Sequence, residues 1–67
     1  MNNNIDEVFE TARNKIERAM SQDGPYTHNL ISMALGSVAD KIGYQNANTL
    51  VEEYGLTELY GIPVVDT

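Results

Sequence analysis

Residues 5–20 read IDEVFETARNKIERAM, and this stretch decides the fold class. Its apolar side chains recur three, four and seven positions apart, which places them along one stripe of an amphipathic helix. We therefore expect a helix over 5–20, with Asn4 as its N-cap and Glu7 completing a capping box. Acidic residues in the first turns and basic residues toward the end favour the same helix through its macrodipole.

A second apolar stripe with helical spacing follows a short run of turn residues. One interpretation is a single helix over 28–42, which Thr27 would cap and which would tolerate Gly36 at a cost of about 1 kcal/mol. The other interpretation is two helices, over 28–35 and 38–42, which meet at Gly36. The sequence leaves both open.

Two shorter helical segments complete the chain. Gly43 ends the second stripe, and Asn46 is placed to cap a helix over 47–54. Thr57 is placed to cap a last helical turn over 57–60, after which a proline and two valines favour an extended tail.

Length and composition allow one small domain. The chain has 67 residues, of which 42% are hydrophobic, and it has no cysteine, so neither a disulfide nor a thiolate metal site can stabilise it. We predict an all-α domain of three to four helices over 1–67, with flexible ends at 1–4 and 63–67. Four side chains lie at the centres of its apolar stripes: Phe9, Ile16, Leu35 and Leu50.

Catalytic, cofactor-binding and metal-binding sets are not recognisable. His28 is the single histidine, and Glu52 and Glu53 are adjacent, so on a helix they point about 100° apart and cannot act together on one substrate. A ligand pocket would also consume the core of so small a domain. We expect a protein that is not an enzyme and needs no cofactor.

Charge is distributed unevenly along the chain. The net charge is -6, and no basic residue follows Lys41. Such a chain repels phosphate backbones and anionic membranes, and it attracts a basic protein surface. We therefore predict an acidic interaction protein that covers a basic site on another protein, as a modulator from a phage or mobile element would. The residues expected to bind the partner are Tyr44, Glu52, Glu53, Tyr60, Ile62 and Val64.

Two further expectations follow from the same features. The sequence has neither the pattern of a signal peptide nor an apolar run long enough to span a bilayer, so we expect a cytoplasmic protein without membrane contact. Its surplus of apolar side chains favours a homodimer whose interface includes the first helix or the C-terminal tail.

Residues 37–54 carry the one motif of the chain, SVADKIGYQNANTLVEEY. It resembles the helix-turn-helix of AraC-type regulators at Ala39, Ile42, Gly43, Tyr44, Asn46, Leu50 and Tyr54. The resemblance implies, as an alternative function, a homodimeric transcriptional regulator that would contact DNA through Gln45, Asn46, Asn48 and Thr49. A purely structural helix–loop–helix is also open.

One departure from the family bears on this alternative. AraC-type proteins read DNA with a second helix rich in polar and basic residues, whereas this one carries Glu52, Glu53 and no base. We therefore expect that nucleic acid is not the partner.

Overall fold

The computed structural model describes residues 4–64, and these form four helices and no strand. The helices are α1 (Asn4–Gln22), α2 (Thr27–Ile42), α3 (Tyr44–Tyr54) and α4 (Leu56–Tyr60). The predicted all-α class is confirmed. The helix expected over 5–20 is longer by one residue at its start and two at its end. The Asn4 cap and most of the expected flexible ends lie outside the described residues and side chains.

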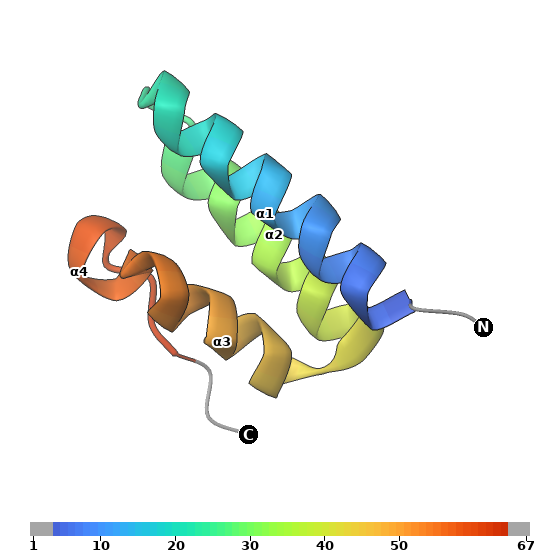
Figure 1. Ribbon diagram of the computed structural model, residues 1–67. Helices are drawn as coiled ribbons and strands as arrows, with labels where there is room; N and C mark the ends of the chain where they lie inside the picture. The colour runs from blue at the N-terminus through green and yellow to red at the C-terminus, as the bar shows by residue number, and fades with distance from the viewer. Residues whose placement is uncertain (1–3, 65–67) are drawn as a thin grey trace.

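The helices form two layers (Figure 1). α1 and α2 run antiparallel as a hairpin, and α3 turns back beneath this hairpin after the bend at Gly43. α4 follows at the far end of α3, and the chain then returns so that Ile62 packs into the core. This order places the turn between α2 and α3 opposite the turn between α1 and α2.

The second apolar stripe forms one helix, which decides between the two interpretations left open by the sequence. Gly36 lies inside α2 on its exposed side, and a Cβ added there would meet no atom within 4 Å. Leu35 and Val38, on either side of it, are both buried. Packing of these neighbours therefore carries the helix through the glycine.

Thr27 does not act as the predicted N-cap. It is the first residue of α2 and is buried, with 4% of its surface exposed. Its hydroxyl accepts a hydrogen bond from the Gly24 N–H at 2.7 Å and donates one to the Ala19 carbonyl at 3.3 Å. The side chain thus holds the α1–α2 turn against the end of α1, where burial requires that the hydroxyl be hydrogen-bonded.

The caps predicted at Asn46 and Thr57 are also wrong. α3 already begins at Tyr44, and the Asn46 amide donates to the Ile42 carbonyl at 2.7 Å. The Thr57 hydroxyl lies inside α4 and donates to the Ile62 carbonyl at 2.6 Å. Both side chains donate hydrogen bonds to backbone carbonyl groups at or beyond the end of a helix. An N-cap side chain does the opposite, because it accepts a hydrogen bond from a backbone N–H.

The core lies between the hairpin and α3, and it includes three of the four side chains predicted at its centre. Ile16 and Leu50 are fully buried, and Leu35 is 7% exposed. Phe9 is the exception, because it is only partly buried and its ring carries the Arg13 guanidinium 5.1 Å from its centroid. The buried apolar residues are Ala12, Ile16, Ala19, Ile31, Ala34, Leu35, Val38, Ala47, Leu50, Val51, Leu56 and Ile62.

Candidate protein-binding surfaces

α3 presents one face to solvent along its whole length. A helix turns about 100° per residue, so positions three and four apart share a face. The buried face consists of Ala47, Leu50 and Val51. The opposite face is exposed and consists of Gln45, Thr49 and Glu52.

An apolar groove of about 220 Å³ runs between α2, α3 and the C-terminal segment. We call it the tyrosine groove, because Tyr44 stands at its edge with 48% of its surface exposed. Small residues keep the two helices close and leave the groove open above them. Its walls include Leu35, Gly36, Ala39, Tyr44, Ala47 and Pro63.

Hydrogen bonds fix the C-terminal wall of this groove. The Ile62 N–H donates to the Leu56 carbonyl at 3.3 Å, and the Ile62 carbonyl accepts from the Thr57 hydroxyl at 2.6 Å. Both backbone groups of Ile62 are therefore satisfied within the protein, as burial requires. The following Pro63 is held in place as part of the wall.

An acidic side chain continues the row that borders the tyrosine groove. Tyr44, Asn48 and Glu52 are spaced four residues apart, so they follow one another along the same side of α3. Tyr44 and Asn48 line the groove, and Glu52 is exposed one turn beyond them. Residues 44–64 contain no base. The row that borders the groove therefore ends in one exposed carboxylate, that of Glu52.

Glu53 points to the other side of α3, where it joins α3 to α1. The Arg13 guanidinium donates two hydrogen bonds to its carboxylate, at 2.9 and 3.0 Å. These bonds lower the pKa of Glu53, and the same bonds raise the pKa of Arg13. Both side chains remain partly exposed. Glu53, predicted to bind the partner, is instead occupied within the chain.

The remaining residues predicted to bind a partner differ in accessibility. Ile62 is only 5% exposed and belongs to the core, so it is a support of the tyrosine groove and does not present a contact surface. Tyr60 is partly buried against the same core. Val64 is 44% exposed and follows Pro63 at the groove wall. Tyr44, Glu52 and Val64 are therefore the exposed members of the set.

The residues of the DNA-binding alternative do not share one surface. Gln45 and Thr49 lie on the exposed face of α3, and the Thr49 hydroxyl donates to the Gln45 carbonyl at 3.0 Å. Asn48 lines the tyrosine groove, whereas the Asn46 amide is bonded to α2. Gly43, with φ 99°, is the single residue between α2 and α3, while helix-turn-helix motifs have turns of three to four residues.

Three basic residues form a surface that the sequence analysis missed. Lys15 and Lys41 line a pocket between α1 and α2, and Lys15 and Arg18 line the pocket beside it. The helix macrodipole alone does not explain the bases of the first helix. A signal is present in the sequence, because Lys15 and Lys41 precede Ile16 and Ile42, which belong to the apolar stripes and are buried and partly buried in the structure.

Metal and membrane sites find no support in the described part of the chain. No group of three or more His, Asp or Glu side chains there is arranged to hold a metal ion. No helix of residues 4–64 combines the length and the apolarity needed to cross a bilayer. Comparison of the chain with protein-family models, curated proteins and solved structures gives no significant match.

Proposed function

We propose that this chain is a non-enzymatic cytoplasmic protein that binds a basic, partly apolar segment of another protein. The observation that carries the proposal is the tyrosine groove, an apolar depression with a half-exposed tyrosine at its edge and Glu52 two turns further along α3. Buried apolar anchors supply most of the affinity of such interfaces, with tyrosine among the favoured residues. The Glu52 carboxylate would select a basic partner.

The mechanism that follows is occlusion of a basic site. An apolar side chain of the partner would enter the tyrosine groove, and a lysine or arginine near it would pair with Glu52. The net charge of -6 would also accelerate the encounter with a basic surface. A small modulator encoded by a phage or mobile element would act on a host protein in this way.

Affinity capture from cells of the source organism tests the proposal when four variants are compared. Tyr44→Ala removes the anchor, and Glu52→Lys reverses the charge beside it. Leu59→Ala and Glu10→Lys are the matched controls, because both side chains are exposed on other parts of the molecule. We expect one protein to be retained by the wild type and both controls but lost with the two groove variants. Equal retention by all five would contradict the proposal.

Transcriptional regulation through residues 37–54 is the second candidate, favoured by the resemblance to AraC-type helix-turn-helix segments. The exposed face of α3 carries Glu52 and no base, so phosphate contacts would lack a cation there. We expect no measurable binding to mixed-sequence duplex DNA at ~150 mM salt in fluorescence anisotropy. Sequence-selective binding below a micromolar would favour the regulator over the interaction protein.

A second copy of the chain is a further candidate partner. Several exposed apolar side chains, including Ile5 on α1 and Val64 in the tail, are available for such a contact. Charge repulsion between two acidic copies is screened beyond about 8 Å at physiological salt. We therefore propose a weak homodimer that tightens as salt is added, which sedimentation velocity at low and high salt would show as an increase in the dimer fraction.

A further inference from the structure

The groove between α1 and α2 differs in charge from the rest of the molecule. Three of the four basic residues of the chain line two adjoining pockets there, and no residue of α3 lines either one. The pockets share Lys15, Ala34 and Ser37, so they form one continuous surface along the hairpin. A basic surface on a chain with a net charge of -6 indicates a ligand of opposite charge.

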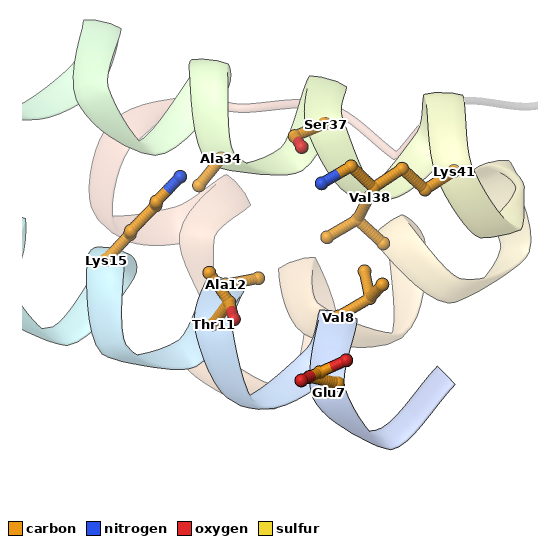
Figure 2. Close-up of a pocket in the computed structure, with 9 residues that line it drawn as sticks. All are labelled: Glu7, Val8, Thr11, Ala12, Lys15, Ala34, Ser37, Val38 and Lys41. Atoms are coloured by element: carbon orange, nitrogen blue, oxygen red, sulfur yellow. The ribbon is translucent and has the colours of Figure 1, made fainter. Parts of the chain in front are cut away.

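Two ammonium groups converge in the first of these pockets. Lys15 extends from α1 and Lys41 from α2, and Figure 2 shows both side chains pointing into the space between the helices. Ser37 on α2 and Thr11 on α1 also line this pocket. Within residues 4–64, the one salt bridge joins Arg13 to Glu53. Lys15 and Lys41 therefore have no salt-bridge partner among these residues. Like charges that face one pocket repel each other, and an anion between them removes that repulsion.

Glu7 and the adjoining apolar surface favour a carboxylate. Glu7 lines the first pocket with Lys15 and Lys41, which leaves one formal positive charge there, and Arg18 in the adjoining pocket adds a second. A carboxylate carries one negative charge and can be joined to an apolar group, whereas a phosphate dianion would place two negative charges beside Glu7. Lys15, Lys41 and Ser37 supply donors for its two oxygens.

The adjoining pocket extends the site with an apolar surface. It has a volume of about 430 Å³, and its lining includes Leu30 and Met33, which are 45% and 64% exposed. Arg18 lies at its border. A ligand that holds its carboxylate between the lysines can therefore lay an apolar group on these two side chains.

We propose that the groove between α1 and α2 binds a carboxylate-bearing protein segment. Its acidic side chain or C-terminus is held between Lys15 and Lys41, and an apolar neighbour contacts Leu30 and Met33. This site lies on a different surface from the tyrosine groove and is independent of the function proposed above. It would let the chain contact a basic and an acidic protein segment at the same time.

Titration of the 15N-labelled protein with small anions, followed by NMR, tests the site. The probes are acetate, hexanoate and inorganic phosphate at equal ionic strength. We expect saturable shifts of the Lys15, Ser37 and Lys41 amides, with hexanoate bound more tightly than acetate because its chain contacts the apolar pocket. Phosphate bound more tightly than hexanoate would overturn the assignment to a carboxylate. Shifts that do not saturate with any probe would overturn the site itself.

Variants separate the two halves of the site. Lys15→Gln and Lys41→Gln should each weaken hexanoate binding about fivefold, the upper range for an exposed ion pair. Met33→Gln should weaken hexanoate but leave acetate unchanged. Arg13→Gln is the matched control, because it removes the same charge away from the groove. Equal weakening by Arg13→Gln would show a response to net charge alone and would contradict the proposal.

Discussion

Two residues of α3 hold it against α1 through side chains that reach across the interface. Tyr54 donates a hydrogen bond to the Glu17 carboxylate, and Glu53 accepts the paired bonds from Arg13. Partial burial, with a second contribution from the bond to Glu17, raises the pKa of Tyr54 to about 12. These contacts join residues far apart in the sequence, so no local sequence pattern predicts them.

The raised pKa of Tyr54 makes stability depend on alkaline pH. An unfolded tyrosine ionises near 10, whereas the folded one keeps its proton until about 12. The unfolded state therefore loses this proton first, and the free energy of unfolding should fall as pH rises from 10 through 12. Tyr54→Phe removes the titrating group, so its melting temperature should fall less steeply over this range. If the melting temperatures of the wild type and Tyr54→Phe fell in parallel over this pH range, the raised pKa of Tyr54 would be contradicted.

Burial separates leucines that look alike in the sequence. Leu50 is fully buried between the hairpin and α3, whereas Leu59 on α4 is 61% exposed. Leu50→Ala should cost about 2–5 kcal/mol, because it removes buried contacts and leaves a cavity. Leu59→Ala should change the free energy of unfolding by less than about 0.5 kcal/mol. Chemical denaturation monitored by circular dichroism measures both changes. Similar unfolding midpoints for the two variants would contradict the placement of Leu50 in the core.

At the scale of elements, apolar periodicity predicted where the helices lie but not how they end. Stripes of buried residues recur at helical spacing in α1, α2 and α3, so their existence follows from local sequence. The polar residues near the ends were misassigned, since Thr27, Asn46 and Thr57 bond to carbonyl groups of other turns or segments. These carbonyl groups lie four to eight residues away along the chain, and the conformation of the intervening turns brings them within hydrogen-bond distance.

Gly36, inside α2, and Gly43, at its C-terminal end, should respond oppositely to substitution by alanine. Gly36 is helical with open space around it, so Gly36→Ala should stabilise the protein by about 0.4–1 kcal/mol. Gly43 has φ 99°, which side chains rarely adopt, so Gly43→Ala should destabilise it by about 1 kcal/mol or more. Thermal melts of both variants measure the difference. Destabilisation by Gly36→Ala would indicate a break in α2 at that residue.

At the scale of the whole molecule, the fold separates charges that the sequence interleaves. Lys15, Arg18 and Lys41 come together on the groove between α1 and α2, while α3 carries an exposed acid, Glu52, one turn beyond the tyrosine groove. The acidic character is evident from composition, and Tyr44, expected to contact a partner, is 48% exposed. Composition did not predict that Ile62 would be buried, because the return of the tail depends on the Thr57 hydrogen bond.

Site-specific photo-crosslinking in the source cells shows directly whether the tyrosine groove binds a basic protein segment. Benzoylphenylalanine is placed at Tyr44, on the groove edge, and at Leu59 for comparison. We expect an adduct from position 44 alone, joined to a protein segment that contains lysine or arginine beside an apolar residue. Equal adducts from both positions, or an adduct with nucleic acid from position 44, would contradict it.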